Sequence, residues 1–80
     1  MTLTEQNARD LVGNSLLRIV PDADLAALPD EALFRDELEL DSLDFLSFVE
    51  LLSGGSGRRI DEDDYPQLRT MADCVSFLST

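Results

Sequence analysis

The stretch Leu40-Asp41-Ser42-Leu43-Asp44, near the middle of the chain, combines residue types that could present a modified hydroxyl group. Asp41 is a good helix N-cap, because its carboxylate can accept hydrogen bonds from the first free backbone N–H groups. Asp44, three residues later, suits the positive end of the helix dipole. Ser42 is then the first helical residue. A phosphate ester on its hydroxyl would lie in a favourable field, since the N–H groups at a helix N-terminus are unpaired. A simple capped helix, whose serine has no chemical role, remains the alternative.

The composition excludes several other kinds of site. The chain has no histidine and a single cysteine, Cys74, so that a Ser-His triad and a zinc site are both excluded. Without histidine, lysine or a metal-binding set to serve as base or electrophile, we expect no enzymatic activity. One cysteine cannot form an internal disulfide, which is typical of a protein of the reducing cytoplasm.

The chain is strongly acidic. Seventeen acidic residues against six arginines give a net charge of −11. This excess disfavours nucleic acid and anionic membranes as partners, and it favours basic proteins or cations. The sequence shows no apolar run long enough to span a bilayer and no signal-peptide pattern at its N-terminus. We therefore expect a cytoplasmic protein that inserts into no membrane.

Three- and four-residue steps between apolar positions predict a first helix over residues 3–19. Thr2 is its predicted cap, with Glu5 reaching back in a capping box, and Pro21 ends it. The predicted core face of this helix consists of Ala8, Leu11, Val12, Leu16, Ile19 and Val20. The long connection over residues 21–40 is predicted to be pinned to the core, with Phe34 as its main anchor.

The second predicted helix runs from Ser42 to Leu52 and is apolar over more than one face. We expect Val49 and Leu52 to be buried. Contact with a partner protein is left open for Leu43, Phe45 and Leu46.

The rest of the chain predicts two further helices. The glycine-rich run at residues 53–57 is predicted to stop the second helix. A short acidic helix is predicted over residues 60–66, and a last helix over 71–79 with Thr70 as its cap. Cys74 is interpreted as a small core residue. The fold class is therefore all-α, a single domain over residues 1–80. We expect a small antiparallel four-helix bundle of three longer helices and one short one.

The chain as a whole resembles an acyl carrier protein. The resemblance covers nearly all 80 residues and centres on Leu40-Asp41-Ser42-Leu43-Asp44 at the start of the second helix. Its supporting stretches are the approach from Phe34 to Leu40, the acidic run Ile60-Asp61-Glu62-Asp63-Asp64, and Leu68-Arg69-Thr70-Met71 before the last helix.

The resemblance implies a mechanism in which the protein carries a cofactor and performs no chemistry itself. A phosphopantetheinyl transferase would move 4'-phosphopantetheine from coenzyme A onto Ser42, which Asp41 and Leu43 flank. The thiol of that arm would hold an acyl group as a thioester, in fatty-acid or specialised biosynthesis. Partner enzymes with basic patches would contact four further residues: Glu39, Asp44, Phe45 and Leu46. From Asp30 to Glu50 there are eight acids and one base, Arg35, which fits such partners. We expect the carrier to be a monomer.

Some positions depart from the family pattern. Glu39 stands where the family usually has glycine. Ser47, Ser53 and Gly54 stand at positions that are commonly acidic in fatty-acid carriers, and Glu50 stands at a commonly apolar one. These departures favour a specialised carrier with dedicated partners. The alternatives are a stand-alone aminoacyl or peptidyl carrier, and an interaction module of the same fold that carries no arm.

Overall fold

The structure is a computed structural model that describes residues 3–79, and within this range it contains helices and no strands. In chain order the elements are α1 (Glu5–Ile19), the 3-10 turn η1 (Leu25–Ala27), α2 (Phe34–Glu37), α3 (Ser42–Ser56), the 3-10 helix η2 (Glu62–Leu68) and α4 (Met71–Leu78). The predicted all-α class and small helical bundle are confirmed. The sequence did not predict α2.

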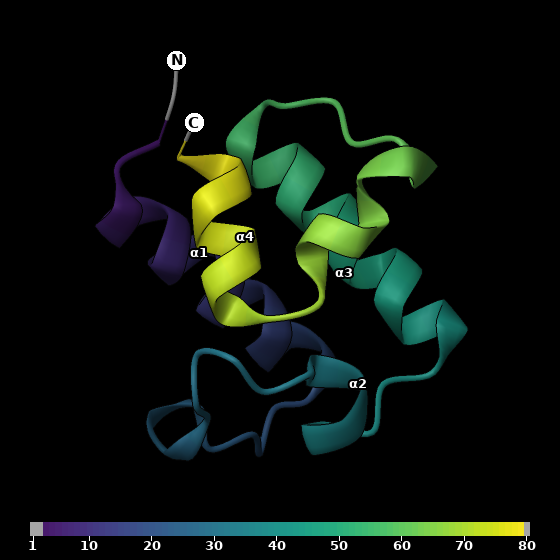
Figure 1. Cartoon of the computed structure of the whole chain (residues 1–80). Coiled ribbons are helices and arrows are strands. Elements are labelled where there is room, and N and C mark those ends of the chain that lie inside the picture. Colours follow the sequence, from purple (N-terminus) through teal and green to yellow (C-terminus); the bar gives the residue numbers. More distant parts are fainter. Residues whose placement is uncertain (1–2, 80) are drawn as a thin grey trace.

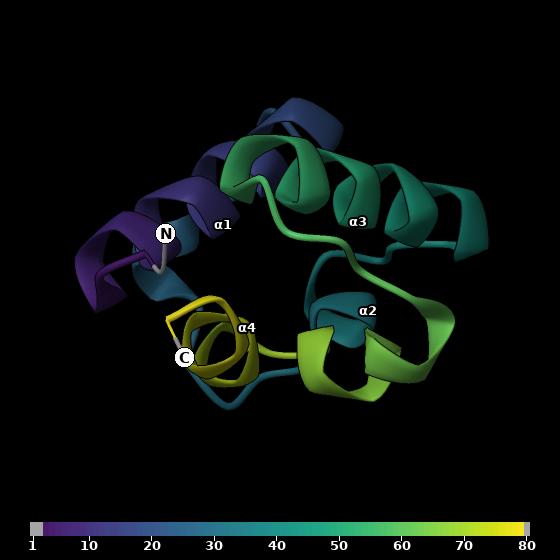
Figure 2. The ribbon, with the colours of Figure 1, turned by 90° about the horizontal axis from the view of Figure 1, so that it is seen from above.

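The helix α1 lies alongside both α3 and α4, as Figures 1 and 2 show. These three helices enclose most of a continuous core, to which α2 and η2 contribute from below and from the side. The side chains with less than 2% of their surface exposed are Phe34, Phe48, Leu16, Leu52, Leu68, Leu78, Val12, Ala8 and Cys74. The predicted burial of Val49 and Leu52 is confirmed. Among residues 3–79, no helix is both long and apolar enough to cross a membrane.

The start of α1 differs from the prediction. The helix begins at Glu5, and its cap is Thr4, whose hydroxyl oxygen accepts a hydrogen bond from the backbone N–H of Asn7 at 3.0 Å. The predicted cap, Thr2, lies outside the described residues. The predicted start at residue 3 is therefore wrong by two residues, because two threonines that are two positions apart carry the same local signal.

The glycine-rich run does not stop α3, and that prediction is wrong. The helix continues through Gly54 and Gly55 to Ser56, and it ends at Gly57, whose φ of 68° is left-handed. A Cβ atom at Gly55 would collide with the side chain of Leu11 on α1. The absence of a side chain at Gly55 thus lets the two helices approach closely. Glycine is helical here although its intrinsic helix propensity is about 1 kcal/mol less favourable than that of alanine.

We expect Gly54→Ala to raise the free energy of unfolding by about 0.5–1 kcal/mol, because nothing lies within 4 Å of a Cβ atom added there and alanine is the better helix former. Gly55→Ala serves as the matched control, since it brings the same gain in propensity but forces Leu11 to move. Urea denaturation of both variants measures the difference. An equal gain in both would contradict the close approach of α1 and α3 at Gly55.

The long connection between α1 and α3 is fixed to the start of α4 by backbone hydrogen bonds. The N–H of Phe34 donates to the carbonyl oxygen of Arg69, and the N–H of Ala72 donates to that of Asp30, each at 3.0 Å. The Asp30 carboxylate also pairs with the Arg9 guanidinium of α1 at 3.0 Å. The hydrogen bond from the Arg9 guanidinium lowers the pKa of the Asp30 carboxyl group. The predicted anchoring of this connection by Phe34 is confirmed, since the side chain is 1% exposed.

The third predicted helix is the 3-10 helix η2, which begins two residues later than predicted. The Asp64 carboxylate accepts a hydrogen bond from the backbone N–H of Asp61 at 3.1 Å, which fixes its first turn. The helix α4 has the predicted cap, because the Thr70 hydroxyl accepts a hydrogen bond from the N–H of Asp73 at 3.1 Å. Cys74 is fully buried, and this burial raises the pKa of its thiol. Its interpretation as a core residue is confirmed.

Candidate functional site

The first turn of α3 is closed by the predicted reciprocal cap. The Asp41 carboxylate accepts a hydrogen bond from the backbone N–H of Asp44 at 2.8 Å, and the Asp44 carboxylate accepts one from the N–H of Asp41 at 3.4 Å. Ser42 is consequently the first helical residue, as predicted, and it is exposed. The cap orients the chain so that the serine hydroxyl lies at the mouth of the helix.

Two backbone donors beside this hydroxyl remain available. The first α-helical hydrogen bond of α3 joins the N–H of Phe45 to the carbonyl oxygen of Asp41 at 2.9 Å. Within residues 3–79, the N–H groups of Ser42 and Leu43 have no acceptor. Such groups, together with the positive end of the helix dipole, favour an anionic group at this position.

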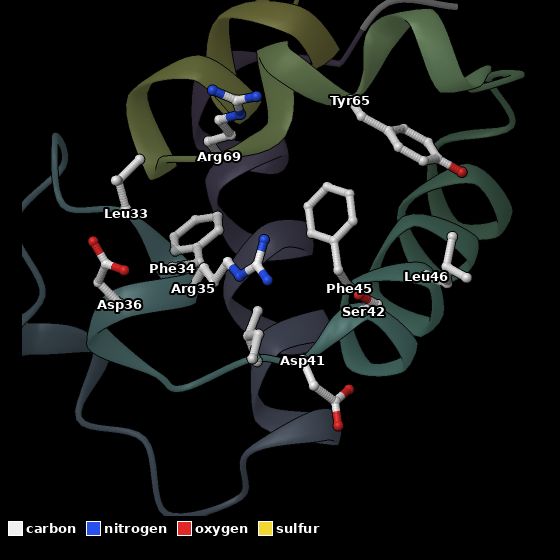
Figure 3. Close-up of a pocket in the computed structure, with 11 residues that line it drawn as sticks. Leu33, Phe34, Arg35, Asp36, Asp41, Ser42, Phe45, Leu46, Tyr65 and Arg69 are labelled. Carbon is white, nitrogen blue, oxygen red and sulfur yellow. The ribbon is translucent and has the colours of Figure 1, made fainter.

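A cleft of about 560 Å³ opens next to Ser42. It lies between α2, the first turns of α3, and η2, and Figure 3 shows the side chains around it. Its lining consists of Leu33, Phe34, Arg35, Asp36, Leu40, Asp41, Ser42, Phe45, Leu46, Tyr65 and Arg69. This volume falls within the range of about 300–1,000 Å³ that is usual for small-molecule sites.

Aromatic rings connect the cleft to the core. The Phe34 ring meets that of Phe48 edge-to-face with centroids 5.6 Å apart, and the Phe45 ring lies 6.3 Å from that of Phe48. On the outer side, Phe45 meets Tyr65 of η2 edge-to-face at 5.3 Å. Phe45 is therefore half-buried, and its ring both packs against the core and lines the cleft.

The structure brings some of the predicted site residues together and separates others. Asp41, Ser42, Phe45 and Leu46 line the cleft. Leu43 lies outside it and is 73% exposed, on the solvent side of α3.

Asp44 and Glu39 also lie outside the lining of the cleft. Sequence reasoning did not assign Arg35, Tyr65 or Arg69 to the site. They reach it from α2, η2 and the segment before α4, and no local pattern predicts that these segments meet.

Glu39 adopts a backbone conformation that favours glycine. Its φ of 54° makes it the one residue other than glycine with a positive φ among residues 3–79. In this left-handed region, the Cβ atom of an L-residue costs roughly 1–2 kcal/mol. The position at which the resemblance leads us to expect glycine is thus one at which the backbone bends in the way that glycine permits.

We expect Glu39→Gly to raise the free energy of unfolding by up to about 1 kcal/mol, because relief of the left-handed strain exceeds the backbone entropy that glycine loses on folding. Glu37→Gly is the control with the same change of charge, and it should destabilise by about 1 kcal/mol since Glu37 is in α2. Thermal unfolding measures both. Equal destabilisation by the two substitutions would show that the bend at Glu39 carries no strain.

Within residues 3–79, no group of histidine, cysteine or acidic side chains is arranged to hold a metal ion. In comparisons with known proteins, no family model and no curated protein matches this chain.

Proposed function

We propose that this chain is an acyl carrier protein, which bears a 4'-phosphopantetheine arm on Ser42 and holds acyl intermediates on it as thioesters. The observation that carries the proposal is the exposed Ser42 hydroxyl at a capped helix N-terminus, beside two backbone N–H groups without acceptors and next to a cleft. A phosphodiester on Ser42 would be stabilised by these N–H groups and by the helix dipole.

The cleft and the acidic charge support the same proposal. The apolar and aromatic part of the cleft offers an attached acyl group shelter from water, and it begins at the attachment point itself. The eight acids between Asp30 and Glu50 offer a negative surface to partner enzymes with basic patches, such as the transferase that attaches the arm. In this proposal the protein is a cytoplasmic monomer, and all covalent chemistry is done by its partners.

The second candidate function is an interaction module of the same fold without an arm. The exposed Leu43 and Leu46, which are 73% and 43% exposed, would suit such a module. They would equally suit a carrier, because any enzyme that acts on Ser42 must approach the same end of α3.

The test is incubation of the protein with coenzyme A and a phosphopantetheinyl transferase, followed by intact mass measurement and peptide mapping. We expect the mass to rise by one arm per chain, with the adduct on the peptide that contains Ser42. No increase in mass with several transferases, or an adduct on another residue, would overturn the carrier proposal.

We further expect Leu43→Ala to slow the transferase on the order of tenfold without changing stability, because this exposed side chain is one residue from the attachment point and apolar anchors dominate protein interfaces. Leu17→Ala provides the control, since Leu17 is 37% exposed on α1, away from Ser42. The rate of arm attachment under limiting carrier is the measurement. Equal rates for the two variants would remove Leu43 from the partner surface.

A further inference from the structure

Three of the six arginines in this acidic chain have a partner. The side chain of Arg9 pairs with Asp30 at 3.0 Å, and that of Arg59 pairs with Asp61 at 3.1 Å. The Arg58 guanidinium donates to the carbonyl oxygen of Phe77 and lies 4.4 Å from the centroid of its ring. With seventeen acidic residues in the chain, such pairing is easy to achieve.

The remaining three arginines differ from these in that their side chains have no partner among the described residues. In the part of the chain that the structure describes, the side chains of Arg18, Arg35 and Arg69 form no hydrogen bond and no ion pair. Arg18 is on α1, whereas Arg35 and Arg69 both line the cleft beside Ser42. Two residues that line the cleft of the candidate site are thus arginines whose side chains have no acidic partner among the described residues, in a protein of net charge −11.

The backbone holds these two arginines in a fixed relation. Arg35 directly follows Phe34, whose N–H donates to the carbonyl oxygen of Arg69 at 3.0 Å. The two side chains therefore start from neighbouring points, on α2 and on the segment that follows η2. In Figure 3 the Arg35 side chain extends from α2 toward the space between the Phe34 and Phe45 rings.

The two acidic residues of the lining form no ion pair with these arginines. The Asp41 carboxylate is engaged by the N–H of Asp44 in the cap of α3. The Asp36 carboxylate extends away from the Arg35 guanidinium, as Figure 3 shows. An occupant of the cleft would thus meet apolar and aromatic walls and the Arg35 guanidinium. The exposed side chain of Arg69, which also belongs to the lining, points away from the two phenylalanine rings in Figure 3.

We propose that Arg35 and Arg69 bind the anionic end of the acyl cargo, so that the cleft selects acyl groups with a carboxylate at the end remote from the thioester. This inference rests on the proposed carrier function, because the cargo reaches the cleft from the arm on Ser42. The methylene part of such a cargo would contact the ring of Phe45 and the side chain of Leu46. Its carboxylate would accept hydrogen bonds from the guanidinium groups, which match carboxylates in geometry and charge.

The experiment compares two cargoes of equal length on the whole protein. The transferase loads Ser42 from amide-linked, non-hydrolysable coenzyme A analogues that carry either a glutaryl group or a neutral pentanoyl group. Thermal unfolding is then measured for each loaded form. We expect the glutaryl form to melt a few degrees above the pentanoyl form, since the ion pairs form only in the folded state.

Single substitutions assign the effect to its residues. Arg35→Gln and Arg69→Gln should each reduce the difference between the glutaryl and pentanoyl forms. Arg18→Gln makes the same change of charge outside the cleft, and it should leave the difference intact. Because all three side chains are exposed and without partners, these variants are expected to fold.

Three outcomes would overturn the inference. One is equal melting of the two loaded forms, and another is a difference that persists in both Arg35→Gln and Arg69→Gln. The third is a change in melting temperature when these substitutions are made in protein whose arm carries no acyl group. That result would show that the arginines bind the phosphodiester. Failure to load Ser42 at all would instead contradict the carrier function itself.

Discussion

Replacement of Ser42 by alanine is expected to abolish attachment of the proposed phosphopantetheine arm and to leave the free energy of unfolding within about 0.5 kcal/mol of its original value. The Ser42 side chain forms no hydrogen bond among the described residues, and the cap of α3 is provided by Asp41. Alanine is also a better helix former than serine. The substitution thus removes the nucleophilic hydroxyl while the helix and the cleft stay in place.

Ser47→Ala is the matched control, because Ser47 is an exposed serine of the same helix. Intact mass after incubation with coenzyme A and the transferase should show a complete shift for Ser47→Ala and none for Ser42→Ala. Urea denaturation should show that both variants are as stable as the parent. An arm on Ser42→Ala would place the attachment site elsewhere and contradict the proposed function.

The features predicted correctly from the sequence are those that depend on neighbours in the chain. The cap of α3 by Asp41 and Asp44 and the cap of α4 by Thr70 involve residues three positions apart, so their spacing alone is sufficient. The same holds for the end of α1 just before Pro21. Ser42 could be predicted as the first helical residue because its position depends entirely on one such cap.

The end of α3 shows where local reasoning fails. Three glycines within four residues predict a loop from propensity, yet Gly54 and Gly55 are helical. Gly55 lies so close to the side chain of Leu11, more than forty positions earlier in the chain, that an added Cβ atom would collide with it, and sequence periodicity cannot reveal this proximity. Of the three glycines, it is Gly57, with its left-handed backbone, that ends α3.

The cleft could not be predicted for the same reason. Its walls come from α2, α3 and η2, and they meet because the backbone of Phe34 binds that of Arg69, thirty-five positions later. A resemblance to a family supplies the motif around Ser42, but it does not identify Arg35 and Arg69 as neighbours of that motif. The position of Ser42 at the start of α3 was therefore accessible from the sequence, and the set of residues around the cleft was not.

The anchoring of α2 gives the largest expected effect on stability. We expect Phe34→Ala to lower the free energy of unfolding by about 3–5 kcal/mol, since the Phe34 side chain is 1% exposed and packs edge-to-face on Phe48 at 5.6 Å. A chain of this size has a total stability on the order of 4–12 kcal/mol, so the variant should be close to its limit at room temperature. Urea denaturation at low temperature gives the difference directly.

Leu33→Ala is the control, because Leu33 is the preceding residue of the same segment and is 43% exposed. It should cost less than about 1 kcal/mol, since little apolar surface is lost from the core. Leu33 and Phe34 are adjacent, so comparing the two variants separates the effect of burying the ring from effects on the local backbone.

The cap that presents Ser42 belongs to α3, so folded Phe34→Ala should still accept the arm. Selection of a carboxylated cargo should fail in this variant, because one wall of the cleft is displaced. Equal losses of stability in Phe34→Ala and Leu33→Ala would contradict the role of the Phe34 ring as the anchor of this segment.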